Sequence, residues 1–241
     1  MPPTIRVRWH GGTGSLSLLI ESFTVLRKEV VSELRSRVAV SSVGLFALTT
    51  LVAVAYQIGP YRIHEQDRPH LHSALLWIIL FFAASSGLPR VFVKEEDAHT
   101  AKALRLAARP GAVFTGKFLF NLVLLLGLEI FLVPLFAVFM GFSVANVPAL
   151  TLVLVAGALG LAATATMVAA IISRATGSAT LFVVLAVPLV LPMLVFLIQG
   201  TRMAVTAAEL SAVLPSLRAV FSLTGVTLVS SAFLFPVVWH D

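Results

Sequence analysis

Six runs of about twenty apolar residues constrain this chain more than any other feature of its sequence. At a rise of 1.5 Å per residue, a helix of about twenty residues crosses a hydrocarbon core of about 30 Å. The sequence therefore predicts an all-α polytopic membrane protein with six transmembrane helices. The predicted spans are 38–58, 71–92, 118–142, 148–173, 179–199 and 215–239.

Composition supports lipid as the solvent for most of the chain. Hydrophobic residues make up 59% of the 241 residues and charged residues only 12%, whereas a soluble domain is about 25% charged. The charges lie in short islands between the apolar runs. Because the chain has no cysteine, disulfides, thiolate metal sites and cysteine nucleophiles are excluded.

Basic residues are divided unevenly between the predicted loops. With the N-terminus inside, only four of the 17 basic residues fall outside, namely Arg62, Arg68, Arg202 and Arg218. The positive-inside rule then predicts that both ends of the chain lie on the cytoplasmic side. The net charge of +6 is thus mainly a topology signal, and we expect no nucleic-acid partner.

The segment before the first span divides into two parts. Residues 1–18 are rich in Gly, Pro and Ser and predict a flexible tail. Residues 19–37 predict an amphipathic helix lying in the membrane interface, before a permease domain over 38–241. Glu33 and Arg37 have the i,i+4 spacing of a helical ion pair. The apolar positions that recur every three or four residues are Leu19, Phe23, Leu26, Val30 and Leu34.

The inner loop 93–117 is the only predicted soluble segment large enough to fold. Residues 95–108 predict a short polar helix that Pro110 and Gly111 end. The segment 111–117 fits the first seven positions of a P-loop, but Phe118 stands where Ser or Thr should bind magnesium, and no strand precedes it. We therefore expect any ATP to be bound by a separate chain.

Several polar residues are candidates for function. His64, His70 and His72 crowd the outer loop after the first span, where they either contact haem or form a polar loop. Glu129 lies near the middle of the third span, where a charge costs about 2.5–3.5 kcal/mol, so it should face the bundle, as a structural hydrogen-bonding group or in a transport pathway. No metal site is predicted. The one pair with di-iron spacing, Glu96 and His99, lacks its second pair.

Two patterns within spans four and five concern helix packing. Small residues at i,i+4 let helix backbones approach closely, within one subunit or across a homodimer. In span five, Pro188 and Pro192 each remove a backbone donor and are a possible hinge. The rows of small residues in span four are Ala156-Gly160-Thr164 and Ala158-Ala162-Thr166-Ala170.

From about residue 23 to 235 the chain resembles the haem exporter protein B (CcmB) family. The resemblance is clearest in two regions, one around the inner loop and one in span five. The matching segments are Leu75-Leu-Trp77, Gly87-Leu-Pro-Arg-Val-Phe92, Glu95-Glu-Asp97, Ala103-Leu-Arg-Leu106, Pro110, Gly116-Lys117 and Leu185-Ala-Val-Pro-Leu-Val-Leu-Pro192.

The resemblance implies a non-catalytic permease subunit of an ABC-type complex for cytochrome c maturation in the bacterial cytoplasmic membrane. It implies no stably bound cofactor, with other maturation subunits and a haem chaperone as partners. Haem is then either a substrate that this subunit moves or a molecule that a partner releases through ATP work. Two alternatives stay open: the permease of an ABC-2-type lipid, polysaccharide or drug exporter, and an intramembrane enzyme or assembly scaffold. The residues expected to dock the separate ATPase subunit are Glu95, Glu96, Asp97, Leu104, Arg105 and Arg109.

Overall fold

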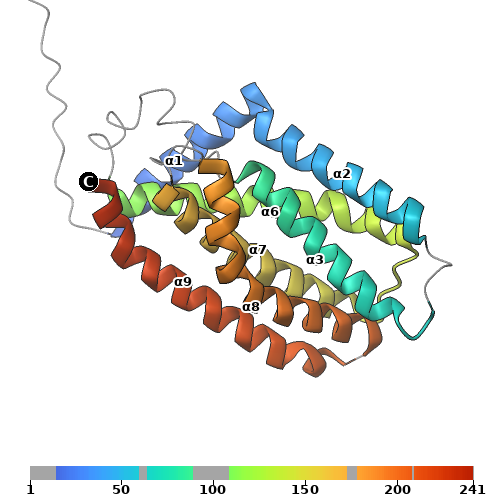
Figure 1. The fold of residues 1–241 in the computed structure, drawn as a ribbon. Coiled ribbons are helices and arrows are strands. Elements are labelled where there is room, and N and C mark those ends of the chain that lie inside the picture. The colour runs from blue at the N-terminus through green and yellow to red at the C-terminus, as the bar shows by residue number, and fades with distance from the viewer. Residues whose placement is uncertain (1–14, 60–63, 89–108, 173–177, 208, 241) are drawn as a thin grey trace, which may run out of the picture.

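A computed structural model describes residues 15–59, 64–88, 109–172, 178–207 and 209–240 (Figure 1). Every secondary-structure element in these ranges is a helix. The helices are α1 (Ser15–Ser36), α2 (Val38–Ile58), α3 (Arg68–Gly87), α6 (Pro110–Met140), α7 (Val147–Ile172), α8 (Ser178–Thr206), the short 3-10 helix η1 (Leu210–Val213) and α9 (Leu214–His240).

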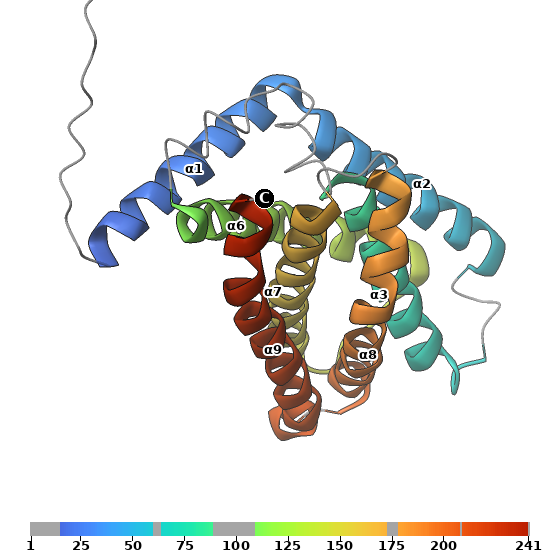
Figure 2. The same ribbon diagram turned by 60° about the vertical axis from the view of Figure 1, so that its left-hand side comes forward.

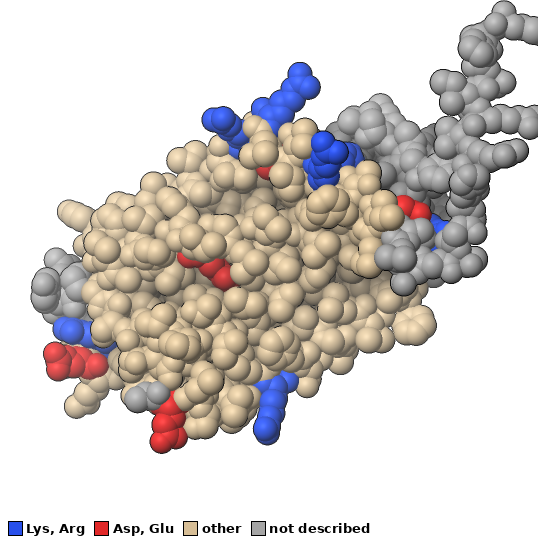
Figure 3. All heavy atoms as spheres, turned by 180° about the vertical axis from the view of Figure 1, so that it is seen from behind, with Lys and Arg blue, Asp and Glu red and all other residues tan. Residues whose placement is uncertain are grey.

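Six of these helices are long and apolar enough to cross a membrane, which agrees with the prediction of six spans. On the face shown in Figure 3, most charged side chains lie along two opposite sides of the molecule, and the broad band between them is uncharged apart from a small acidic patch. This distribution matches a hydrocarbon layer around the middle of the bundle. The six are α2, α3, α6, α7, the part of α8 over Val184–Thr206, and Leu210–Pro236, which covers η1 and most of α9.

Helix α2 has the predicted bounds, but three other helices begin three or more residues earlier than the sequence predicts. Helix α6 begins at Pro110 and not at 118, so the predicted loop 93–117 ends by 109. Proline is favoured at the first helical position, where its missing N–H costs nothing. The segment 111–117 is therefore helical and cannot form a P-loop.

The other two early starts affect the predicted tail and the predicted histidine loop. Helix α1 begins at Ser15, four residues before the start of the predicted interfacial helix. Helix α3 begins at Arg68, with Pro69 in its first turn, so His70 and His72 are helical. Two residues apart on a helix, they point to different sides.

Helices α1 and α2 meet at a sharp elbow and form an inverted V above α6 and α7 (Figure 2). Arg37, between them, has the left-handed backbone conformation with φ 56°. Glu33 is not paired with Arg37 as predicted. Its Oε1 instead accepts hydrogen bonds from the backbone N–H groups of Ala39 and Val40, at 2.7 and 3.0 Å. Those donors have no partner within α2, so Glu33 caps α2 and fixes the elbow.

Helix α7 forms the centre of the bundle and packs against α6, α8 and α9. Both predicted rows of small residues are buried along it, which confirms close packing within the subunit. Helix α3 packs against α2 and α8. The N–H of Asn146 donates to the carbonyl of Ala204 at 2.9 Å, so the connection between α6 and α7 lies beside the end of α8.

Trp77 joins three helices in this core. The side chain is fully buried, and its Nε1 donates to Oγ1 of Thr201 on α8 at 2.7 Å. The indole ring lies directly against Gly157 of α7, where an added Cβ would overlap with it. Only glycine at 157 lets α3 approach α7 this closely.

We expect Gly157→Ala to destabilise the protein by about 1–3 kcal/mol, the usual cost of overpacking a core. Gly225→Ala on α9 is the matched control, because a Cβ there meets no atom within 4 Å and alanine is the better helix former. Thermal unfolding of both variants in one detergent tests this. Equal melting temperatures would contradict the packing described for Trp77.

Candidate coupling site at the junction of helices α1 and α6

Helix α1 lies along the first turns of α6 and contacts it at three successive points. The first involves Arg109, the residue just before α6, whose backbone is extended (φ −69°, ψ 146°). The Arg109 N–H donates to Oε2 of Glu21 at 3.4 Å, and its Nε lies 3.9 Å from Oε1 of the same carboxylate. Because a helix N-terminus carries partial positive charge, a carboxylate beside it is stabilising. Glu21 thus caps α6 from α1.

The second contact is a close approach of the two backbones at Gly116. A Cβ placed on Gly116 would lie 2.6 Å from Cβ of Val25 and 2.8 Å from the carbonyl oxygen of Ser22. Both distances are well inside van der Waals contact. A side chain at 116 would therefore push α1 away from α6, and the glycine sets the separation of the helices.

The third contact is an ion pair between Lys117 and Glu29. The Lys117 side chain is fully buried, and its Nζ lies 3.0 Å from Oε1 of Glu29, whose side chain is 6% exposed. Lys28 reaches the same oxygen at 3.2 Å from a half-exposed position. Burial alone would raise the pKa of the Glu29 carboxyl, but the attraction of Lys117 and Lys28 outweighs it, so the pKa is lowered. Glu29 is therefore ionised at neutral pH.

One turn further along α6, a buried hydrogen bond connects the junction to the central helix. Nδ2 of Asn121 donates to Oγ1 of Thr166 on α7 at 2.9 Å, and the Thr166 hydroxyl donates to the carbonyl of Ala162 at 2.6 Å. Oδ1 of Asn121 is buried without a hydrogen-bond partner in the described part of the chain. Polar contacts thus run from α1 through α6 to α7.

The predicted docking residues can be placed only in part. Arg109 takes part in the junction through Glu21. The other predicted docking residues, Glu95, Glu96, Asp97, Leu104 and Arg105, lie outside the described residues.

The three histidines do not form one surface cluster. His64 and His70 are exposed, whereas His72 is 3% exposed. The His72 ring packs edge-on against Phe136 and Phe142, with ring centroids 6.0 and 5.9 Å away. Its Nε2 is buried and has no hydrogen-bond partner among the described residues. His72 therefore belongs to the core, and only His64 and His70 can meet a ligand at the surface.

The remaining candidates lie inside the membrane-spanning helices. Glu129 is 5% exposed on α6, two turns beyond Asn121. Pro188 and Pro192 lie within α8, which runs on as one helix past both. Within the described ranges, no three His, Asp or Glu side chains gather closely enough to hold a metal ion.

Sequence reasoning missed Glu29, Gly116 and Asn121 as functional candidates. The helical spacing places Glu29 among the polar residues of α1, and its partner lies 88 positions away. One local signal was present. Lys117 stands directly before a long apolar run, and a lysine at the edge of hydrocarbon needs a nearby anion.

Replacing Lys117 by Met should leave the Glu29 carboxylate buried with only Lys28 beside it. Breaking a buried ion pair costs about 3–5 kcal/mol, and we expect the lower end because Lys28 remains. The double variant Lys117→Met/Glu29→Gln should regain most of this loss, since no charge stays buried. Lys28→Met is the control, with an expected loss below about 1 kcal/mol. Denaturant unfolding in mixed micelles measures these three variants together with the single variant Glu29→Gln, and additive losses for Lys117→Met and Glu29→Gln would refute the pairing.

Comparison with known proteins places this architecture in a family. A family model described as "CcmB protein" matches residues 20–238, which includes the α1–α6 junction and all six candidate spans. No curated protein matches the chain. The family match decides against the alternatives of an ABC-2-type exporter and of an enzyme or scaffold. The chain belongs to the CcmB family, the non-catalytic membrane permease subunits of the ABC transporter for haem export in cytochrome c maturation, which work with a separate ATPase subunit, CcmA.

Proposed function

We propose that the α1–α6 junction couples the CcmA ATPase to the transmembrane bundle. In this arrangement, residues 38–241 form the permease domain in the bacterial cytoplasmic membrane, with both chain ends in the cytoplasm. The observation that carries the proposal is the buried Lys117–Glu29 pair at 3.0 Å. Its lysine lies on α6, about two turns after Arg109, where the segment proposed to bind the ATPase ends.

The orientation rests on which charges lie at which end of the bundle. Three described basic residues, Arg68, Arg202 and Arg218, lie at the end where α2 meets α3 and where α8 meets α9. The end with α1 carries more, which supports a cytoplasmic position for it under the positive-inside rule. The described basic residues there are Arg27, Lys28, Arg35, Arg37, Arg109 and Lys117.

An interfacial position for α1 is supported by the two faces of the helix. The face toward α6 buries Val25 and Glu29. Apolar residues elsewhere on α1 are exposed, including Ile20 at 67%, Phe23 at 65% and Leu34 at 68%. Exposed apolar rings and chains next to basic residues suit the boundary between headgroups and acyl chains. Helix α1 would then contact α6 on one side and lipid on the other.

Docking of CcmA is proposed on Glu95, Glu96, Asp97, Leu104, Arg105 and Arg109. Arg109 both ends this segment and contacts Glu21 of α1. A displacement applied to the docking segment would therefore act on α1 and α6 together. The contact at Gly116 and the ion pair at Lys117 would prevent α1 from slipping along α6.

Further roles follow from the family function and the positions of the polar residues. We take haem as a substrate and not as a stably bound cofactor, with His64 and His70 as its outer contacts and Glu129 in the pathway. Pro188 and Pro192 are the proposed hinge of α8. Other cytochrome c maturation subunits and a haem chaperone act on the outer side, ATP enters only through CcmA, and a homodimer is the proposed assembly.

The orientation can be tested with single cysteines, because the natural chain has none. Glu65→Cys and Glu209→Cys should react with a membrane-impermeant maleimide in intact spheroplasts. Arg27→Cys should react only after the membrane is opened. All three side chains are exposed in the fold, so burial does not explain a lack of reaction. The reverse pattern would overturn the N-in orientation.

The coupling role can be separated from docking. Lys117→Met/Glu29→Gln should still co-purify with CcmA, whereas Leu104→Pro in the docking segment should lose it. Cytochrome c formation with the double variant should fall about tenfold, because the change removes a coupling free energy of about 1–3 kcal/mol. Arg218→Gln, at the opposite end, is the control and should keep full activity. Full activity of the double variant would refute the proposal.

A further inference from the structure

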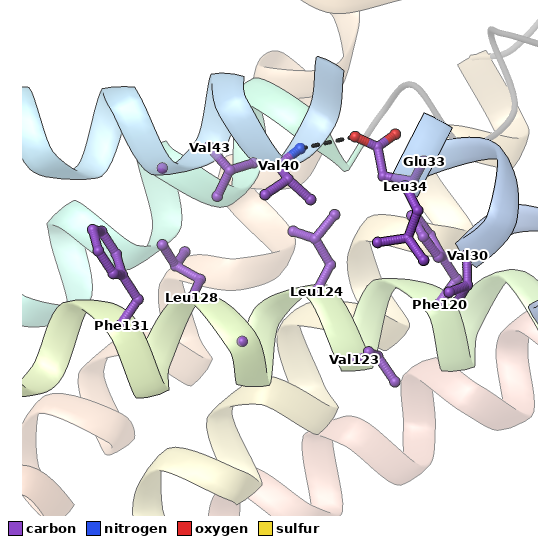
Figure 4. Close-up of a pocket in the computed structure, with 12 residues that line it drawn as sticks. Val30, Glu33, Leu34, Val40, Val43, Phe120, Val123, Leu124, Leu128 and Phe131 are labelled. Atoms are coloured by element: carbon purple, nitrogen blue, oxygen red, sulfur yellow. Dashed lines mark hydrogen bonds between the residues drawn. The ribbon is translucent and has the colours of Figure 1, made fainter. Parts of the chain in front are cut away.

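An apolar groove lies beneath the elbow of α1 and α2, against α6 (Figure 4). Its volume is about 410 Å³, within the range of ligand-binding pockets. Neither the family function nor the proposed coupling role uses it. Its lining residues come from all three helices: Val30, Glu33, Leu34, Val40, Val43, Gly44, Phe120, Val123, Leu124, Gly127, Leu128 and Phe131.

Among the described lining residues, Glu33 alone is charged. One of its carboxylate oxygens already accepts the backbone N–H groups of Ala39 and Val40, as the dashed line in Figure 4 marks for one of them. The groove therefore has almost nothing to offer a polar ligand. Its occupant should be a hydrocarbon chain.

Haem, the substrate of the family, does not suit the groove. Among the described residues that line the groove there is no histidine, methionine, lysine or arginine, so these residues offer iron no side-chain nitrogen or sulfur ligand. Arg35 and Arg37 at the elbow could pair with haem propionates as well as with a phosphate, so haem is set aside because the described lining residues lack an iron ligand. A partner's transmembrane helix is about 10–12 Å across, and the crosslinking experiment below distinguishes it from lipid.

The edges of the groove point to lipid. Leu34, Val40 and Val123 line it and are 68%, 56% and 54% exposed, so the groove opens beside apolar side chains. Arg35 and Arg37 are exposed at the elbow; Arg35 directly follows the lining residue Leu34, and Arg37 lies between the lining residues Leu34 and Val40. Basic residues at a membrane surface attract anionic headgroups. The two features together match one molecule with an apolar tail and a negatively charged head.

We infer that the groove holds one acyl chain of an anionic phospholipid, with its phosphate at Arg35 and Arg37. The inference rests on the interfacial position proposed for α1. It requires neither haem nor CcmA, so the test uses the chain alone, and loss of coupling activity does not bear on it. The bound lipid would fill the space between the elbow and α6.

Two glycines allow the groove to be filled. A Cβ on Gly44 or Gly127 meets no atom within 4 Å, so leucine at either position enters open space without pushing a backbone. Gly225→Leu on α9 is the matched control, since its Cβ is equally free and it is no part of the lining. Size-exclusion profiles in detergent check that all three variants fold.

The probe is a phosphatidylglycerol with a diazirine near the end of one acyl chain, reconstituted with the purified chain in phosphatidylcholine nanodiscs. In the wild-type protein, photolabelling should map to the region of Leu124, Leu128 and Phe131. Gly127→Leu and Gly44→Leu should lose most of this label, and Gly225→Leu should keep it. Unchanged labelling of both groove variants would overturn the inference. The wild-type map decides the question even if those variants fail to fold.

The headgroup part is tested by charge. Arg35→Gln should lower labelling by about fivefold, the ratio that corresponds to about 1 kcal/mol for one basic residue near a membrane surface. Arg37→Asn should do the same, because asparagine tolerates the left-handed conformation. Arg218→Gln should have no effect. The inference would be overturned if a phosphatidylcholine probe labelled the groove equally well. It would also be overturned if, in the whole complex, the groove crosslinked to a partner's helix and not to lipid.

Discussion

The buried side chain of Lys117, near the start of α6, determines where the N-terminal helix α1 must lie. The Lys117 side chain has no exposed surface, and an ammonium group in such a place is costly unless a carboxylate accompanies it. Glu29 supplies that carboxylate only when α1 lies along α6. Gly116 removes the one side chain that would keep the two backbones apart. The position of α1 thus depends on one ion pair and one glycine.

The rest of the N-terminal half follows from that placement. Once α1 lies on α6, the chain must turn sharply to start α2. Arg37 makes this turn with a positive φ, which is unfavourable for a residue with a side chain. The hydrogen bonds from Ala39 and Val40 to Glu33 offset this cost. Because the elbow stands away from α6, an apolar groove remains beneath it.

The sequence predicts the spans well because their signal is local. A run of apolar residues long enough to cross a membrane leaves few alternatives, and α2 agrees with its predicted bounds at both ends. The start of α6 was predicted wrongly because Pro110 can follow one helix or begin another. Its contact with α1, through Glu21 and Arg109, lies too far away in the sequence for a local pattern to reveal.

The candidate site is less predictable for the same physical reason. A helical pattern identifies which residues share a face, but not which face meets a neighbour. Glu29 has the spacing of a solvated residue and is buried by a partner 88 positions away. The sequence analysis assigned His72 to a loop. In the structure it lies on α3, and its ring packs against Phe136 and Phe142. An error of a few residues in a helix start changes which side chains reach the surface.

Movement can be transmitted between helices only through contacts that do not slip. Apolar side chains in lipid lack directional contacts, so a purely apolar interface between α1 and α6 would allow one helix to slide along the other. The ion pair at Lys117 and the close contact at Gly116 fix their relative position, and Asn121 continues the connection to Thr166 on α7. Helix α7 in turn packs against α8 and α9. Across the groove, α2 has apolar contacts with α6. A push at Arg109 would therefore reach α7 through the polar contacts of α6 and would reach α2 through α1 and the hydrogen-bonded elbow, so the proposed coupling should act on both.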